Sequence, residues 1–238
     1  MAMQRQHVLI GDLGWGGRMG TIARSSILAH RGSWNEHVAR NSRTALCSAL
    51  LAGFGLETDI RDLDGALVIS HDPPTRSDDI ITFDWLLDFY AVNGCTGTLA
   101  LNIKADGLAE MTHRALRAHG VNSYFVFDMS IPDMLAYIRA GMPVYTRVSE
   151  YEPTPALAAE SAGIWLDNFT GEFPQVDVAE GLSTNGKPIA LVSPELHKRP
   201  HETFWSSLRD RPNLDLASML LCTDFPDAAA VYFGSEAA

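Results

Sequence analysis

Short apolar and β-branched runs alternate with helix-compatible stretches from residue 26 almost to the end of the chain. Strands that alternate with helices in this way form parallel sheets joined by crossover helices. Eight such units within about 200 residues predict an α/β fold, a (β/α)8 TIM barrel, although the periodicity alone also fits an open, doubly wound sheet. The predicted strands span residues 26–30, 55–61, 98–104, 123–129, 143–148, 163–169, 188–193 and 218–224.

A further apolar run at residues 66–71 follows the second strand closely and predicts an extra β-hairpin after it. We expect a three-residue loop over 63–65, with Gly65 in the left-handed conformation. Counting outward from this loop places Glu57 opposite His71, so that the acid and the imidazole share one face of the hairpin. A register shift of one residue would separate them.

The length and composition indicate one folded domain. The chain has 238 residues, of which 46% are hydrophobic, without a compositional break between its halves. Residues 1–24 include the glycine-rich stretch GDLGWGGRMG, which fits neither the dinucleotide-binding nor the P-loop pattern. We therefore expect a loosely packed N-terminal leader over 1–24, followed by a barrel domain over 25–238.

The formal net charge of -11 argues against binding to nucleic acid or to an anionic membrane. A phosphate-bearing ligand would therefore need local cations or a metal ion. The three cysteines are isolated and show neither a disulfide framework nor zinc-ligand spacing. Because no apolar run is long enough for a signal-peptide core or a membrane span, the sequence predicts a cytoplasmic protein without a stable membrane anchor.

Polar residues stand at the carboxyl ends of the predicted strands. In a (β/α)8 barrel these ends meet at one mouth, whereas in another fold the same residues would be scattered over the surface. The sequence thus predicts an unusually ionic mouth. The residues at these ends are His30, Arg31, Glu57, Asp59, Asn102, Lys104, Asp128, Arg147, Asp167, Glu195 and Asp224.

Glu57 and Asp59 lie two residues apart on one strand and therefore point to the same face. Two carboxylates so placed repel each other unless a cation sits between them, and oxygen ligands of this kind suit Mg²⁺ or Ca²⁺. The alternative is that Glu57 pairs with Arg61 or Lys104 in a structural ion network.

His30 and His71 each end an apolar run. A neutral imidazole that accepts a proton and a protonated one that donates it are what hydrolysis of an unreactive ester needs at neutral pH. Taken alone, His30 also reads as a packed histidine at the end of a strand. The other histidines, at positions 7, 37, 113, 119, 197 and 201, read as surface residues, and SPELHKRP after the seventh strand reads either as part of a binding loop or as a solvated charged loop.

Cations and aromatic residues at the mouth are candidates for substrate binding. Arg31 and Lys104 could bind a phosphate or, alternatively, form salt bridges with the acidic residues nearby. Arg147 ends the strand over 143–148 and is a further candidate. Trp165, like Tyr145 and Phe169, reads either as a contact for an alcohol or sugar group or as a core residue.

Five segments of the chain resemble one enzyme family in order. HRG followed by NS, then ETDIRDLDGALVISHD, LNIK and CTDFPDAA are similar to the motifs HRG, PENT, ExD, HD, ExK and TDxPD of the glycerophosphodiester phosphodiesterases. The resemblance covers about residues 27–230. It implies a barrel in which a divalent cation, Mg²⁺ or Ca²⁺, is held at Glu57 and Asp59. His30 and His71 would then be the general acid and base.

The resemblance also places Arg31 and Lys104 near the phosphate. Two of the family's carboxylates are replaced in this chain. The third metal carboxylate falls on Asn102, so that Asp128 or Glu195 would have to compensate, and the glutamate of PENT falls on Arg40. The segment between HD and LNIK is also shorter than the one that family members often carry over the glycerol pocket.

The resemblance implies a metal-dependent phosphodiesterase that acts on a glycerophosphodiester or a related small phosphodiester. A cyclising reaction like that of sphingomyelinase D is a variant within the family. The alternatives are a barrel that binds a phosphorylated ligand without efficient turnover, and a phosphosugar isomerase or aldolase that uses Lys104 as a Schiff base. The sequence carries no signal for the leaving alcohol or for an oligomeric state.

Overall fold

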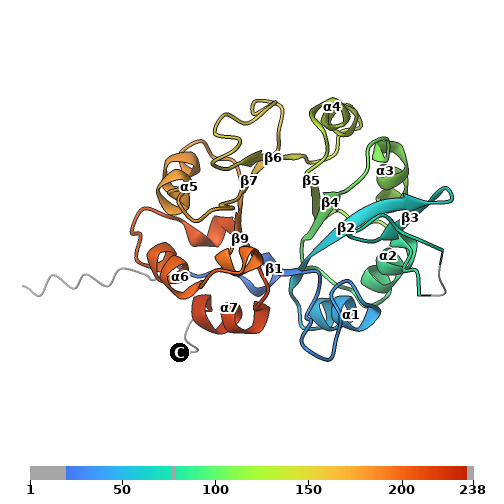
Figure 1. Ribbon diagram of the computed structural model, residues 1–238, viewed down its shortest axis with the longest axis horizontal. Helices are drawn as coiled ribbons and strands as arrows, with labels where there is room; N and C mark the ends of the chain where they lie inside the picture. Colours follow the sequence, from blue (N-terminus) through green and yellow to red (C-terminus); the bar gives the residue numbers. More distant parts are fainter. Residues whose placement is uncertain (1–19, 77–78, 235–238) are drawn as a thin grey trace, which may run out of the picture.

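The computed structural model describes residues 20–76 and 79–234, and within these ranges strands and helices alternate along the chain (Figure 1). The strands are β1 (Ile27–His30), β2 (Gly55–Leu63), β3 (Ala66–Ile69), β4 (Leu99–Ile103), β5 (Tyr124–Phe127), β6 (Tyr145–Val148), β7 (Gly163–Leu166), β8 (Ile189–Val192) and β9 (Met219–Thr223). The α-helices are α1 (Arg43–Leu51), α2 (Phe83–Val92), α3 (Ala109–Ala118), α4 (Ile131–Arg139), α5 (Gln175–Ser183), α6 (Glu202–Arg209) and α7 (Pro226–Phe233). Three 3-10 helices lie at Arg24–Ser26 (η1), Pro194–His197 (η2) and Leu216–Ser218 (η3).

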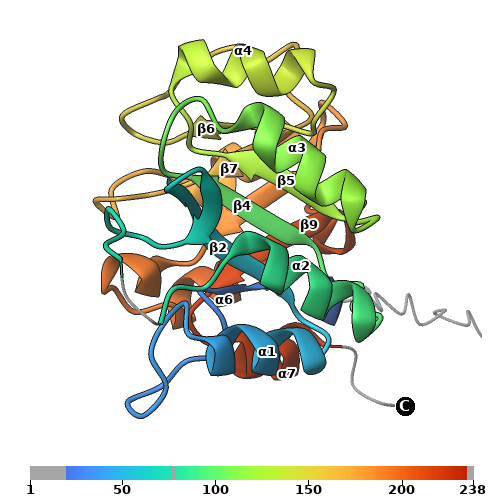
Figure 2. The same cartoon turned by 90° about the vertical axis from the view of Figure 1, so that its right-hand side faces the viewer.

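The sheet curves into a nearly closed barrel. Its order is β5-β4-β2-β1-β9-β8-β7-β6, and all of these neighbours pair in parallel. The two end strands meet through a parallel bridge between Val126 and Val144. The helices lie outside the strands, and Figure 2 shows α1 to α4 along one side of the barrel. The predicted (β/α)8 barrel is confirmed, and the open doubly wound sheet is excluded.

The extra hairpin is also confirmed, but its turn differs from the prediction. β3 pairs antiparallel with β2, and Leu63 lies opposite Ala66. The loop therefore has two residues, Asp64 and Gly65, both with positive φ (53° and 83°). Positive φ at both positions is the backbone of a type I′ turn, whose twist matches that of the two strands, and Asp-Gly is one of the residue pairs that favour it. The predicted three-residue loop is wrong.

The two-residue turn moves the hairpin register by one residue. The Ser70 amide donates to the Asp59 carbonyl at 3.1 Å, so His71 does not lie opposite Glu57 on the hairpin. Glu57 and His71 therefore do not share a face of the hairpin, and the prediction that followed from the longer loop is wrong on this point. The chain beyond β3 has to bring the histidine to the acid instead.

Apolar side chains fill one end of the barrel interior. The Phe125 and Tyr145 rings stack with their centroids 3.8 Å apart, and the Phe127 and Trp165 rings stack at 3.9 Å. Leu28 and Cys222 are fully buried in the same cluster. A larger apolar cluster joins the outer faces of the strands to the helices. Because the barrel interior is packed with apolar side chains, the carboxyl end of the strands is the expected place for a binding site.

The tight packing at the start of β4 yields a stability prediction. A Cβ atom added at Gly97 would collide with the backbone carbonyl of Phe54, which cannot move without disturbing the strand. We expect Gly97→Ala to lower the free energy of unfolding by roughly 2 kcal/mol or more. The matched control is Gly181→Ala in α5, where nothing lies within 4 Å of the added atom. It should raise stability by about 0.5–1 kcal/mol.

Urea denaturation of the two variants and the parent protein measures both effects. Equal stability of the two variants would show that the space around Gly97 can relax.

The N-terminal leader lies largely outside the described residues, because the structure describes the chain from residue 20. Near the end of this leader Ile22 is buried, and its amide donates to the Phe233 carbonyl at 3.1 Å. This residue packs against the end of α7. Across the described ranges, no helix has both the length and the apolar character that crossing a bilayer requires.

Candidate active site

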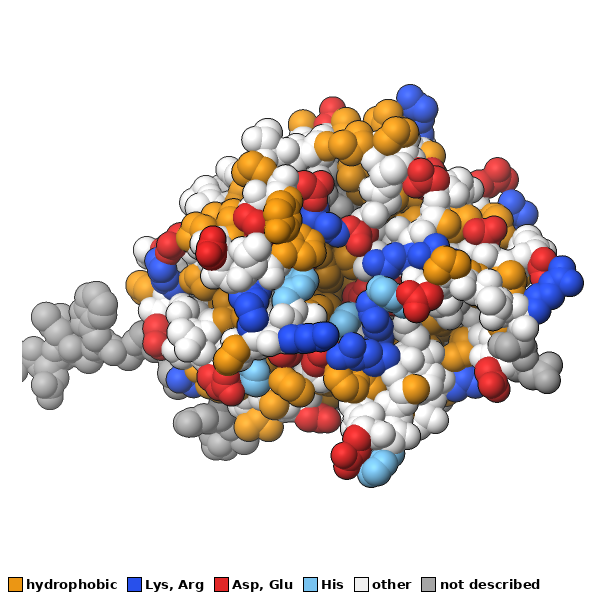
Figure 3. Space-filling model, viewed as in Figure 1, with side chains coloured by type: hydrophobic (Ala, Val, Ile, Leu, Met, Phe, Trp, Pro, Cys, Tyr) orange, Lys and Arg blue, Asp and Glu red, His pale blue; other side chains and the backbone are white. Residues whose placement is uncertain are grey.

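A cavity of about 280 Å³ opens at the carboxyl ends of the strands. Lys, Arg and His side chains gather around a hollow near the centre of this face of the molecule (Figure 3). The structure brings together nine of the ten predicted site residues, and only Asp59 is absent from the cavity wall. The nine are His30, Arg31, Glu57, His71, Asn102, Lys104, Asp128, Arg147 and Trp165.

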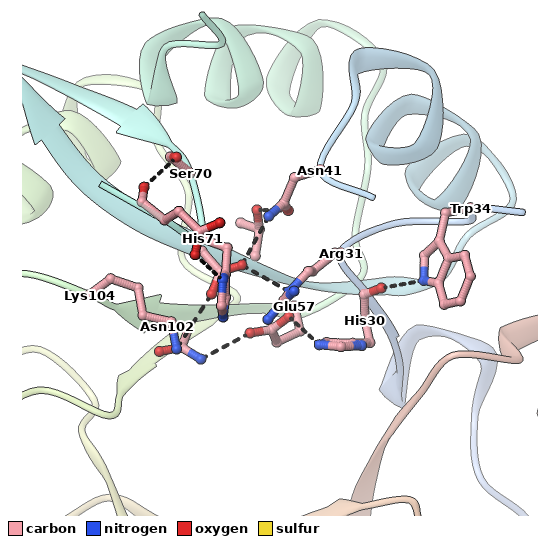
Figure 4. Close-up of polar contacts among 12 residues, drawn as sticks. His30, Arg31, Trp34, Asn41, Glu57, Ser70, His71, Asn102 and Lys104 are labelled. Carbon is pink, nitrogen blue, oxygen red and sulfur yellow. Dashed lines mark hydrogen bonds and ion pairs between the residues drawn. The ribbon is translucent and has the colours of Figure 1, made fainter. Parts of the chain in front are cut away.

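His30 ends β1 and is held by a carboxylate from the neighbouring strand. Its Nδ1 lies 2.6 Å from Oδ1 of Asp224, which follows β9, while the Arg40 guanidinium donates to the other oxygen of Asp224 at 3.1 Å. Because a carboxylate only accepts, Nδ1 carries the proton. The Nε2 atom of His30 then faces the cavity, 3.9 Å from Oε2 of Glu57 (Figure 4). This is the nitrogen that could exchange a proton with a ligand.

Glu57 is a buried carboxylate whose one ion-pair contact among the described residues is His30, 3.9 Å away. Its Oε1 accepts from the Asn102 amide at 3.3 Å, whereas Oε2 has no hydrogen-bond partner among the described residues. Burial raises the pKa of this carboxyl, and the charge of Asp59 raises it further. The alternative ion network is not seen, since Arg61 donates to the His71 carbonyl and Lys104 pairs with Asp59 and Asp128.

Asp59 is fully buried and holds the predicted phosphate-binding cations. Its Oδ2 lies 3.0 Å from Nε of Arg31 and accepts from the Asn41 amide at 2.9 Å. The Lys104 ammonium lies 3.6 Å from Oδ1 and 3.5 Å from the Asp128 carboxylate. Arg31 and Lys104 thus line the cavity and are fixed from behind by an acid.

Three buried oxygens in this region could hold a cation. Oε2 of Glu57, Oδ1 of Asp59 and Oδ1 of Asn102 all lack a hydrogen-bond partner in the part of the chain that the structure describes. Two carboxylates and an amide oxygen are ligands that Mg²⁺ and Ca²⁺ accept, with water completing the coordination. Among residues 20–76 and 79–234, no three His, Cys, Asp or Glu side chains form a metal-binding group. These oxygens therefore fit a hard divalent cation that has two carboxylate ligands, from Glu57 and Asp59, and one amide ligand, from Asn102.

Asp128, the other predicted metal ligand, lies between two cations. It pairs with Lys104 and with the Arg147 guanidinium, and its backbone is left-handed with a φ of 74°. Its role as a metal ligand stays a prediction. Glu195, which could also compensate for Asn102, does not line the cavity, because its Oε1 accepts from the Asp224 amide at 3.2 Å beneath the mouth.

His71 reaches the cavity although the hairpin register differs from the prediction. It follows β3 by two residues, and its side chain is 47% exposed at the rim. Its Nδ1 lies 2.9 Å from the Asp72 carboxylate. Figure 4 shows the His71 ring pointing toward Glu57 and Asn102. The two predicted catalytic histidines are therefore on one cavity, with His30 buried at its floor and His71 at its edge.

The aromatic candidates divide between the cavity and the core. Trp165 and Phe169 line the cavity, whereas Tyr145 stacks on Phe125 in the packed interior. Trp165 is itself almost fully buried, so only a small part of its ring is available to a ligand.

The structure adds residues to the site that were not among the predicted site residues. His197 was predicted to lie on the surface, but it lines the cavity and its Nε2 lies 2.7 Å from Asp167. The prediction was wrong because η2 follows β8 directly and carries His197 to the mouth. Arg40 lines the cavity as well, with its guanidinium 3.8 Å from the centre of the Trp34 ring. The reading of SPELHKRP as a binding loop was the one available signal for His197.

Several solved structures with a similar fold are described as glycerophosphodiester phosphodiesterases. A protein of Galdieria sulphuraria assigned to these enzymes aligns with a TM-score of 0.71 and 13% identity over 90% of this chain and 99% of its own. The enzyme of Agrobacterium tumefaciens aligns with a TM-score of 0.63 and 17% identity over 88% of this chain and 99% of its own.

A phosphodiesterase of Oleispira antarctica, in complex with the product sn-glycerol-3-phosphate, aligns with a TM-score of 0.59 and 16% identity over 88% and 96% of the two chains. No protein-family model and no curated protein sequence matches the chain. The resemblance drawn from the motifs is thus confirmed at the level of the fold.

Proposed function

We propose that the protein is a metal-dependent phosphodiesterase that hydrolyses a glycerophosphodiester or a related small phosphodiester. The observation that carries the proposal is the gathering of His30, His71, Arg31 and Lys104 at one small cavity, beside three buried oxygens without a hydrogen-bond partner among the described residues. The motifs occur in the same order as in the glycerophosphodiester phosphodiesterases, and a structure with this fold holds sn-glycerol-3-phosphate. Both support the same reaction class.

Separate groups of residues bind the phosphate and the cation. Arg31 and Lys104, anchored by Asp59, bind the phosphate oxygens and orient the diester. Glu57, Asp59 and Asn102 would hold the divalent cation, which when bound stabilises negative charge on the phosphoryl group. The fixed positions of these groups lower the barrier because little rearrangement is needed as charge develops.

Two proton transfers complete the reaction. A neutral imidazole of the His30 and His71 pair accepts the proton of the attacking water, and the other, protonated, gives a proton to the departing alcohol oxygen. The phosphorus–oxygen bond to that alcohol breaks as the bond to water forms. Asp224 keeps the Nε2 atom of His30 directed at the cavity.

The geometry argues against a Schiff-base enzyme on the same barrel. The Lys104 ammonium lies between the carboxylates of Asp59 and Asp128. It is therefore placed as an ion-pair partner and not as a free nucleophile.

Metal-stripped protein tests the proposal. We expect hydrolysis of bis(p-nitrophenyl) phosphate and glycerophosphocholine to return when Mg²⁺, Mn²⁺ or Ca²⁺ is added. Phosphorus NMR of the glycerophosphocholine product should show a monoester; a cyclic phosphate would instead establish the cyclising reaction. Ligand binding without turnover under every metal would contradict the proposal and favour a binding barrel.

A further inference from the structure

The wall of the cavity opposite the acidic strand carries groups that the proposed reaction does not use. Following the sheet order around the barrel, β7 lies four positions from β2 in either direction, so it stands across the mouth from Glu57 (Figure 1). Asp167 follows β7 directly, and His197 ends η2 just after β8. Both line the cavity.

Asp167 fixes the orientation of the His197 ring. The carboxylate is 4% exposed, and its Oδ1 accepts from the Asn168 amide at 2.8 Å and from Nε2 of His197 at 2.7 Å. Since a carboxylate can only accept, Nε2 carries the proton. The Nδ1 atom is then the nitrogen left for a ligand, on a side chain that is 23% exposed.

The loops that carry this pair are tied to each other and to the barrel. The Arg199 guanidinium donates to the Asn168 carbonyl, and the Phe169 and His197 rings pack with their centroids 4.9 Å apart. Beneath η2, the buried Glu195 carboxylate accepts from the Ser193 hydroxyl at 2.5 Å. The imidazole is therefore held in place before a ligand arrives, which reduces the entropy lost on binding.

We propose that His197 is a specificity-determining residue that hydrogen-bonds a hydroxyl group on an alcohol portion of the diester, and that Asp167 is its positioning residue. The inference rests on the proposed function. With the phosphate at Arg31 and Lys104, a cavity of about 280 Å³ leaves room for one small group toward β7 and β8.

The chemistry of this wall selects the class of that group. The Phe169 ring packs on His197, and the Arg147 guanidinium carbon lies 5.3 Å from the centre of the same ring. A short polyol can hydrogen-bond the imidazole and the guanidinium while its carbon atoms pack on the ring. An alkyl or aryl group would displace water from these polar groups without replacing its hydrogen bonds, and that costs affinity.

The test compares two diesters in one variant. His197→Leu should lower kcat/KM for glycerophosphocholine about 10- to 100-fold, because the substrate hydroxyl would then lie in the cavity without a hydrogen-bond partner. For bis(p-nitrophenyl) phosphate, which has no hydroxyl, kcat/KM should stay within about threefold, since no hydrogen bond is lost. His197→Gln, which keeps a hydrogen-bonding group, should recover part of the loss. His37→Leu is the matched control, because its side chain is 83% exposed and does not line the cavity.

The ratio of kcat/KM for the two diesters distinguishes a failure of the role of His197 from a failure of the proposed function. An equal loss for both diesters, or no loss for glycerophosphocholine, would overturn the role of His197 while the phosphodiesterase stands. If the parent protein hydrolyses neither diester with any metal, the proposed function fails and the inference fails with it. Thermal unfolding checks that His197→Leu is folded, and His197→Ala provides the same comparison if leucine disturbs the loop.

Discussion

Replacing His30 with alanine should lower diester hydrolysis by about 10²- to 10⁴-fold, which is the usual contribution of a general acid or base. The effect is expected because Nε2 of His30 is the buried nitrogen that faces Glu57, and Asp224 holds it there at a distance of 2.6 Å from Nδ1. His71→Ala should lose activity as well, since it removes the second proton carrier.

Steady-state rates with bis(p-nitrophenyl) phosphate and saturating metal measure the two losses. Circular dichroism and thermal unfolding should show that both variants fold like the parent protein. The exposed His37 provides the control, and His37→Ala should keep full activity. Full turnover in both the His30 and the His71 variant would exclude imidazole catalysis at this cavity.

Glu57→Gln should abolish the stabilisation of the protein by divalent cations. A ligand present at 100 times its Kd raises the free energy of unfolding by about 2.7 kcal/mol, so a bound metal gives a clear rise in Tm. The glutamine keeps the shape of the side chain but removes one of the two acidic oxygen donors. Without metal, the variant should be at least as stable as the parent protein, because the charged form of a carboxyl as buried as Glu57 is costly.

Asn102→Asp is the reverse experiment on the same oxygen set. It supplies a third carboxylate where the unpaired Oδ1 of Asn102 now lies, and we expect it to strengthen the response of Tm to Mg²⁺ and Ca²⁺. Asp72→Asn is the control, since this carboxylate is 89% exposed. An unchanged metal response in Glu57→Gln, measured by thermal shift and calorimetry, would contradict the proposed cation site.

The sequence was sufficient to identify most of this site because barrel strands are short and end at one mouth. Each apolar run marks a strand, and the polar residues near its carboxyl end are carried to the mouth whatever the loops do. His30 and Lys104 were found in this way, as were Glu57, which lies in register with His30, and Asn102, which lies in register with Asp59. The Asp-Gly pair at positions 64 and 65 is also typical of the two-residue turn that the structure shows. The error in register arose because a three-residue loop was predicted there.

Only the tertiary structure decided which of these groups touch. The bond between His30 and Asp224 joins residues 194 positions apart, and that between His197 and Asp167 joins residues 30 positions apart. The barrel closes through a bridge between Val126 and Val144, which the hydrophobic pattern of the sequence does not predict. Local patterns determine which elements form and where their ends lie. The partner of each charge depends on the chain path between elements, which places Arg31 and Lys104 beside Asp59 and leaves one Glu57 oxygen without a hydrogen-bond partner among the described residues.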